Sequence, residues 1–100
     1  MTVVAYVPDL IDRSKVAAAG DVVFVDDPEA LVDAPGDVVV VDLMRPGVLE
    51  VLPALRGRRV IGFGRHTERA LLEAASAAGC DEVLPRSSFF PHLADLLRTP

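Results

Sequence analysis

The chain has 100 residues, a formal net charge of −5 and 51% hydrophobic residues, which suits a single folded domain over residues 1–100 and argues against disorder. A net-acidic chain is a poor candidate for nonspecific nucleic-acid binding, which requires clustered Lys and Arg, and no apolar run approaches the ~20 residues of a membrane-spanning helix. The single Cys80 excludes an internal disulfide, and no signal-peptide pattern opens the sequence, so we expect a cytoplasmic location without nucleic acid or membrane as partners.

The first elements follow from short β-branched runs and the breaks between them. Residues 3–7 predict a strand, and a helix follows from about residue 10 to residue 19. Gly20 is placed to end this helix in the left-handed conformation. Residues 22–25 predict the second strand.

The next segment leads into an unbroken valine run. Asp27 before Pro28 predicts the N-cap of a short helix that reaches about residue 34. Four valines at residues 38–41 cannot alternate apolar with polar side chains, so we expect a strand that is buried on both faces. Asp42 stands at the carboxyl end of this strand. Because ligands bind at that edge of open parallel sheets, Asp42 is the first candidate site residue.

The second half of the chain continues the alternation. Residues 48–55 predict a helix that an internal proline shortens or kinks, and residues 59–63 predict the fourth strand. Residues 67–78 predict the clearest helix of the chain, with Thr67 as its cap and Gly79 as its stop.

The last pair of elements completes the pattern. Residues 82–84 predict the fifth strand, and Ser87 or Ser88 is expected to cap a final helix. Five alternations of strand and helix imply parallel strands joined by right-handed crossovers. The expected fold class is therefore α/β: a five-stranded parallel sheet of the flavodoxin-like order 2-1-3-4-5 with helices on both faces.

Two segments of the sequence resemble the receiver domain of bacterial response regulators. Residues 42–47, Asp-Leu-Met-Arg-Pro-Gly, are similar to the phosphoacceptor segment of that family. Residues 79–87, Gly-Cys-Asp-Glu-Val-Leu-Pro-Arg-Ser, are similar to the run into its fifth strand and signature lysine. The likeness covers nearly the whole chain.

The resemblance implies a phosphoryl-transfer chemistry. In that family the Asp at the end of strand three accepts a phosphoryl group, while a magnesium ion held by acids after strand one, a Lys after strand five and a Ser or Thr after strand four offset the charge. The resemblance makes Asp42 the candidate phosphoacceptor, and it makes Asp9 and Asp42 the candidate acidic and metal-binding residues. No cofactor is expected otherwise; magnesium is expected only if Asp42 accepts phosphate.

The sequence departs from the family pattern around this site. Asp9 has no second acid beside it, and Asp12 is expected to reach the strand ends only if the first helix starts late. Gly64 stands where a hydroxyl residue is expected. Arg86 replaces the lysine and is the candidate charge partner, although its planar group is differently directed. We therefore expect a receiver-like signalling or protein-interaction module that does not depend on phosphorylation.

Two other functions stay open at this point. One is a working phosphoacceptor in a two-component phosphorelay. The other is a binder of a small anionic ligand, because residues 62–67 open a helix after a strand and can present backbone amides to an anion. Gly64 and Arg65 are the candidate anion-binding residues, and Arg65 is also a candidate partner for the carboxylate of Asp42 or Asp9.

The expected partner is a protein, either another signalling protein or a histidine kinase. We expect a stand-alone, non-enzymatic module. Ala70, Ala77 and Phe89 predict an apolar face through which a homodimer forms. The two histidines and Cys80 match no compact metal-ligand spacing, and Cys80 is expected to be a small apolar residue.

Overall fold

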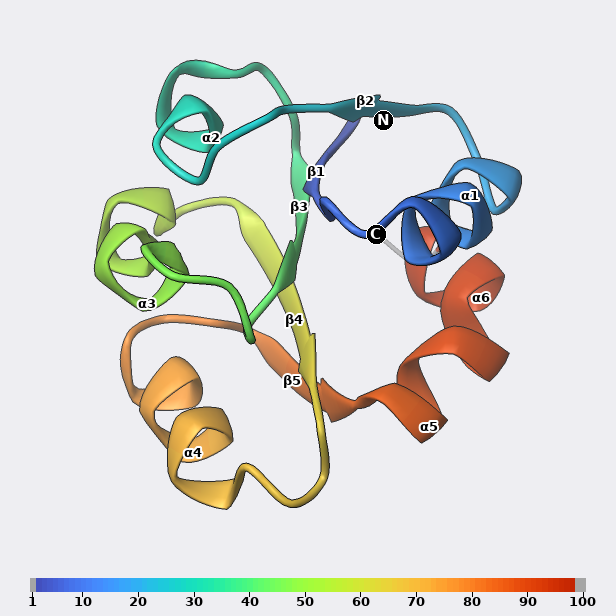
Figure 1. Ribbon diagram of the computed structural model, residues 1–100. Helices are drawn as coiled ribbons and strands as arrows, with labels where there is room; N and C mark the ends of the chain where they lie inside the picture. Colours follow the sequence, from blue (N-terminus) through green and yellow to red (C-terminus); the bar gives the residue numbers. More distant parts are fainter. Residues whose placement is uncertain (1, 99–100) are drawn as a thin grey trace.

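The computed structural model describes residues 2–98 and contains a five-stranded sheet in the order β2-β1-β3-β4-β5 (Figure 1). All neighbouring strands run parallel. The predicted fold class and strand order are therefore confirmed. The strands are β1 (Val3–Tyr6), β2 (Val22–Phe24), β3 (Val38–Asp42), β4 (Arg59–Gly64) and β5 (Glu82–Pro85).

Helices cover both faces of this sheet, so that the molecule has three layers (Figure 1). One face carries α2 (Ala30–Asp33), α3 (Val48–Val51), the 3-10 turn η1 (Leu52–Leu55) and α4 (Arg69–Ala77). The opposite face carries α1 (Leu10–Ala18), α5 (Arg86–Phe89), the 3-10 turn η2 (Phe90–His92) and α6 (Leu93–Arg98). Among the described residues, no helix has both the length and the apolar character needed to cross a membrane.

The valine run of β3 lies at the centre of the sheet, between β1 and β4. Val39 and Val41 pack into the core under α2, α3 and α4, whereas Val38 and Val40 pack into the core under α1, α5 and α6. All four side chains are buried. The expectation of a strand buried on both faces is confirmed, because consecutive side chains of a strand point to opposite faces.

Three predicted helix ends can be compared with the observed ones. Gly79 follows α4 with a positive φ of 118°, as predicted for a stop residue. The prediction for Gly20 is wrong: Ala19 ends α1 in the right-handed conformation, and its N–H donates to the carbonyl of Val16 at 3.1 Å. This tighter final turn satisfies the carbonyl without a left-handed residue. Asp27 makes a side-chain bond of the predicted kind, since its Oδ1 accepts the N–H of Ala30 at 2.9 Å, but α2 begins only at Ala30, so that Glu29 and not Asp27 directly precedes the helix.

Two predicted serine or threonine caps are wrong. Helix α4 begins at Arg69, beyond Thr67, and the residue before it makes no side-chain capping bond. A backbone bond from Glu68 to the carbonyl of Arg65, 3.0 Å long, closes the turn there. At the last helix, α5 begins at Arg86, directly after the extended residue Pro85, so that the predicted caps at 87 and 88 lie inside the helix.

The predicted final helix is divided into α5, η2 and α6, because a proline lies in its middle. Phe89 is fully buried and stacks on Phe63 of β4, with ring centroids 4.4 Å apart. Phe90 meets both rings edge-on, at 5.2 and 4.9 Å. Phe89 is therefore a core residue, and it does not contribute to the apolar dimer face for which it was a candidate.

Candidate functional site

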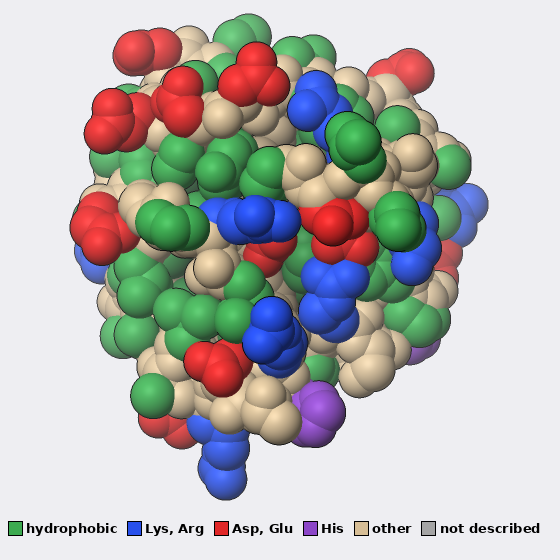
Figure 2. Space-filling model, in the orientation of Figure 1, with side chains coloured by type: hydrophobic (Ala, Val, Ile, Leu, Met, Phe, Trp, Pro, Cys, Tyr) green, Lys and Arg blue, Asp and Glu red, His purple; other side chains and the backbone are tan. Residues whose placement is uncertain are grey.

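A pocket of about 600 Å³ opens where the strands end. Residues that follow β1, β3, β4 and β5 contribute to it, because the carboxyl ends of parallel strands meet at one edge of the sheet. On the face of the molecule that Figure 2 shows, basic and acidic side chains lie side by side near the centre. The lining residues are Asp9, Ile11, Asp12, Lys15, Asp42, Met44, Arg45, Pro46, Arg65 and Arg86.

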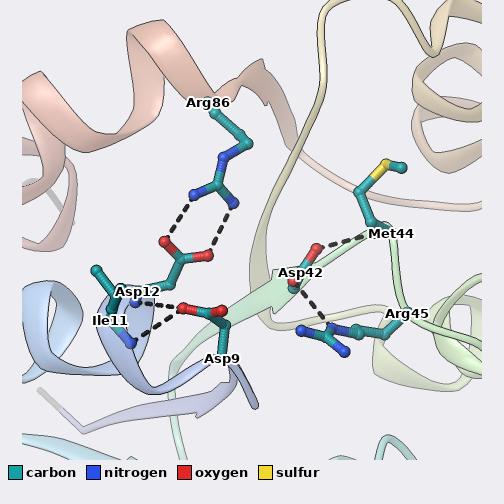
Figure 3. Close-up of polar contacts among 7 residues, drawn as sticks. All are labelled: Asp9, Ile11, Asp12, Asp42, Met44, Arg45 and Arg86. Atoms are coloured by element: carbon teal, nitrogen blue, oxygen red, sulfur yellow. Dashed lines mark hydrogen bonds and ion pairs between the residues drawn. The ribbon is translucent and has the colours of Figure 1, made fainter.

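Asp42 ends β3 and lines this pocket while only 3% of its surface is exposed. Its Oδ1 accepts the N–H of Met44 at 3.0 Å, and its Oδ2 lies 3.4 Å from Nε of Arg45 (Figure 3). The contact with Met44 closes the turn after the strand, as Asp side chains commonly do. The positive charge beside Asp42 is therefore that of Arg45 and not that of Arg65.

Asp9 is the N-cap of α1. Its Oδ1 accepts the backbone N–H groups of Ile11 and Asp12, both at 3.0 Å (Figure 3). The hydrogen bond from Asp12 is the main cause that lowers the pKa of the Asp9 carboxyl, and the charges of Arg45 and Arg86 lower it further. Asp9 is thus held as an anion at the pocket, with one oxygen committed to the helix.

Asp12 and Arg86 form the strongest polar contact of the site. Both carboxylate oxygens of Asp12 accept from the guanidinium, at 2.6 and 2.8 Å, and Asp12 is 4% exposed (Figure 3). The hydrogen bond to Asp12 is also the first cause that raises the pKa of Arg86. The guanidinium lies over the ring of Phe90, 5.0 Å from its centroid.

The expectation that Asp12 reaches the strand ends only if the first helix starts late is wrong. Helix α1 begins at Leu10, no later than predicted, and Asp12 still reaches the strand ends from the first helical turn. A signal for this was present in the sequence. Asp12 is four residues before the buried Val16 and therefore shares the inward face of α1.

Gly64 and Arg65 are placed differently relative to the pocket. Arg65 lines the pocket and is exposed, and among the described residues it makes no ion pair. Gly64 is buried beside α4, where a Cβ added to it would lie 3.1 Å from the side chain of Leu72. The structure therefore brings Asp9, Asp42, Arg65 and Arg86 together at one pocket, whereas Gly64 is not among its lining residues.

The residues of the pocket do not fit a magnesium ion. Mg²⁺ prefers oxygen ligands, usually one or two carboxylates together with water. Here both oxygens of Asp12 are bound to Arg86, one oxygen of Asp9 caps α1, and Asp42 contacts Arg45. The lining contains four cationic side chains and three carboxylates, so its formal charge is 4 − 3 = +1.

No group of three or more His, Cys, Asp or Glu side chains in the described part of the chain is arranged to hold a metal ion. Cys80 lies apart from the pocket and is 6% exposed, as expected for a small apolar residue. Burial raises the pKa of its thiol to about 12, so the thiol stays protonated at neutral pH.

Comparison with protein-family models finds no match, and comparison with curated protein sequences finds none either. Solved structures give clear matches. A response regulator from Hahella chejuensis shares 17% identity at a TM-score of 0.80, with 95% of this chain and 90% of that chain covered. A response regulator from Thermotoga maritima shares 16% identity at a TM-score of 0.78, with 97% and 93% covered.

A signal receiver domain of two-component signal transduction (histidine kinase) from Clostridium thermocellum shares 19% identity at a TM-score of 0.77, with 97% of this chain and 94% of that chain covered. These identities are too low to carry an activity from one protein to another, whereas the TM-scores establish a shared fold. The fold of this chain is that of receiver domains.

Proposed function

We propose that this chain, with its receiver fold, is a signalling or protein-interaction module that works without phosphorylation of Asp42. The observation that carries the proposal is the pairing of its acids with arginine side chains. Arg86 binds both oxygens of Asp12, and Arg45 lies beside Asp42. These contacts occupy the groups that a phosphoacceptor site would need for a metal ion and a phosphoryl group.

The physical argument concerns the charge that develops on the phosphoryl oxygens. Phosphoryl transfer depends on positioning and on electrostatic stabilisation of those oxygens. Gly64 supplies no hydroxyl group, and Arg86 is committed to Asp12. One missing stabilising contact costs about 3 kcal/mol of barrier, on the order of a hundredfold in rate. The altered contacts together therefore favour a module that is not switched by phosphate.

The competing proposal is a phosphoacceptor with a histidine kinase as its partner. Asp42 favours it, because this carboxylate ends β3 and lines the pocket. In that case one phosphoryl group is transferred to a carboxylate oxygen of Asp42. In our proposal the partner is a signalling protein that recognises the folded surface, and the chain itself catalyses no reaction.

The test is incubation with acetyl phosphate and Mg²⁺, followed by measurement of the intact mass. We expect the wild-type protein to show no adduct above the level of Asp42→Asn, while a phosphorylatable receiver treated in parallel gains one phosphoryl group. An adduct that forms in the wild type and disappears in Asp42→Asn would overturn the proposal.

A second variant sharpens this test. Arg86→Lys with Gly64→Thr restores the two side-chain types that the family pattern expects. A Cβ at position 64 would lie 3.1 Å from the end of the Leu72 side chain and 3.6 Å from the sulfur of Met44, and both side chains are flexible, so we expect the variant to fold. If the altered contacts are the obstacle, the double variant gains an adduct that depends on Asp42. If it gains none, these two contacts are not the obstacle and this argument for the proposal fails.

A further inference from the structure

The charges of the pocket do not cancel. Asp12 pairs with Arg86, and Asp42 pairs with Arg45. Among the lining residues this leaves Asp9 as the remaining acid and Lys15 and Arg65 as the remaining cations. Neither Lys15 nor Arg65 forms an ion pair within the described part of the chain. The surplus charge of the pocket is therefore positive, and it is carried by Lys15 and Arg65, whose charges no acid among the described residues offsets in an ion pair.

These cations come from three separate segments. Lys15 belongs to α1, where its ammonium lies 5.0 Å from the centroid of the Phe90 ring. Arg45 follows β3, and it contacts Asp42 through Nε, which leaves its terminal nitrogens without a described partner. Arg65 follows β4. Planar guanidinium groups present paired N–H donors that match the geometry of phosphate and carboxylate oxygens.

We propose that this pocket binds a compact oxyanion, of the class of inorganic phosphate or a small phosphomonoester, noncovalently and without a metal ion. Arg65, Lys15 and the terminal nitrogens of Arg45 are the binding groups. The volume of about 600 Å³ lies within the ~300–1,000 Å³ range of small-molecule sites, so there is room for more than phosphate alone. This inference rests on the proposed function, in which the pocket does not carry out magnesium-dependent phosphorylation.

The effect of Asp9 distinguishes an anion-binding site from a metal-binding site. Its carboxylate is an opposing charge for a bound anion, whereas for a metal ion it is a ligand. Asp9→Asn removes the charge and keeps the amide oxygen that accepts the N–H groups of α1. The substitution is therefore expected to strengthen the binding of an anion and to weaken the binding of a cation.

The experiment is a titration with inorganic phosphate in metal-free buffer at constant ionic strength, followed by amide chemical shifts in NMR spectra. We expect saturable shifts around the pocket in the wild type. Asp9→Asn lowers the Kd roughly two- to fivefold, the range for one exposed charge. Arg65→Gln and Lys15→Gln raise the Kd by a similar factor. Thermal unfolding of each variant checks that the fold is retained.

Matched controls keep the change of charge and move it away from the pocket. Glu73→Gln and Arg69→Gln alter exposed residues of α4 that do not line the pocket, and we expect them to leave the Kd unchanged. The inference is overturned if phosphate does not saturate, if binding requires Mg²⁺, if Asp9→Asn fails to tighten it, or if Arg65→Gln behaves like Arg69→Gln.

Further titrations distinguish the sources of the oxyanion. Glycerol phosphate, sulfate and malonate are compared with inorganic phosphate under the same conditions. Tighter binding of glycerol phosphate assigns the site to a phosphomonoester, and equal binding of all four assigns it to oxyanions in general. Because this measurement needs neither acetyl phosphate nor Mg²⁺, its failure is distinct from the appearance of a phosphoryl adduct on Asp42.

Discussion

Asp12 and Arg86 are 74 positions apart in the sequence, yet they form a two-point hydrogen-bonded ion pair. Asp12 needs this partner, because a buried carboxylate without a partner carries a large desolvation cost. Arg86 also covers the aromatic rings of Phe63 and Phe90 with its planar face. This residue therefore has a structural role at the position where the family pattern expects a lysine.

Arg86→Ala is expected to lower the free energy of unfolding by about 2–3 kcal/mol, less than the ~3–5 kcal/mol of a fully buried pair, because the side chain of Arg86 is 38% exposed. Urea unfolding at neutral pH measures the change. The matched control is Arg98→Ala, which breaks the exposed pair with Asp95 and is expected to cost less than about 1 kcal/mol.

A double substitution shows whether the cost of Arg86→Ala arises from the unpaired carboxylate of Asp12 or from the loss of the Arg86 side chain itself. Asp12→Asn together with Arg86→Ala removes the buried charge, and we expect it to be more stable than Arg86→Ala alone. Equal stabilities of the two variants would contradict a cost that arises from the unpaired carboxylate.

At the residue scale, the sequence predicts which residues meet at the strand ends better than it predicts how these residues pair. Asp9, Asp42, Arg65 and Arg86 were all predicted near the strand ends, and all line one pocket. Their placement follows from topology alone, because every strand of the sheet ends at the same edge. Pairing could not be predicted in this way, since the choice of Arg45 over Arg65 beside Asp42 depends on where each side chain points.

Strand β4 packs closely against Leu43, the residue after β3, because Gly62 has no side chain. Gly62 pairs with Val41 in the sheet, and a Cβ added to it would lie 2.8 Å from the buried side chain of Leu43. Such a contact is too short to form without movement of Leu43 or of the strand. A glycine in the interior of a strand is therefore a requirement of this packing.

Gly62→Ala is expected to destabilise the fold by about 1–3 kcal/mol, the usual cost of overpacking a core. Leu43→Ala is expected to cost about 2–5 kcal/mol through the cavity that it leaves. Urea unfolding of both variants and of the double variant gives their coupling. We expect the double variant to lose less than the sum of the two costs, because the smaller residue at 43 accepts the new methyl group. Strict additivity would contradict the contact.

At the element scale, runs with a strong hydrophobic pattern were predicted well and their ends were not. The four valines of β3 fixed a central strand, and the alternation of strands and helices fixed the order of the sheet. Gly20 and Thr67 were assigned end roles from residue type, but backbone bonds from Ala19 and Glu68 close those turns. Helix ends depend on such local bonds, which several sequences can supply.

At the scale of the whole molecule, the large exposed apolar side chains lie away from the predicted dimer face, which was expected at Ala70, Ala77 and Phe89. Leu10 and Ile11 lie on α1, Val23 on β2 and Val32 on α2. Phe89 is buried, so the proposed face retains only the small exposed side chains of Ala70 and Ala77. A stable interface needs roughly 800 Å² from each partner, which two alanines do not provide.

We therefore expect light scattering to give the mass of a monomer, independent of protein concentration. Leu10→Ser and Ala70→Glu serve as paired probes, one on each side of the molecule. A mass that rises with concentration, and that falls back only in Ala70→Glu, would support self-association through α4 and contradict this expectation.

The bond between Asp12 and Arg86 also has a consequence for synthesis of the chain. Translation proceeds from the N-terminus, so the acid emerges from the ribosome long before the base that binds it. Until residue 86 is released, α1 carries a carboxylate that cannot be buried without a counter-charge. We therefore expect the docking of α1 on the sheet to be one of the later events of folding.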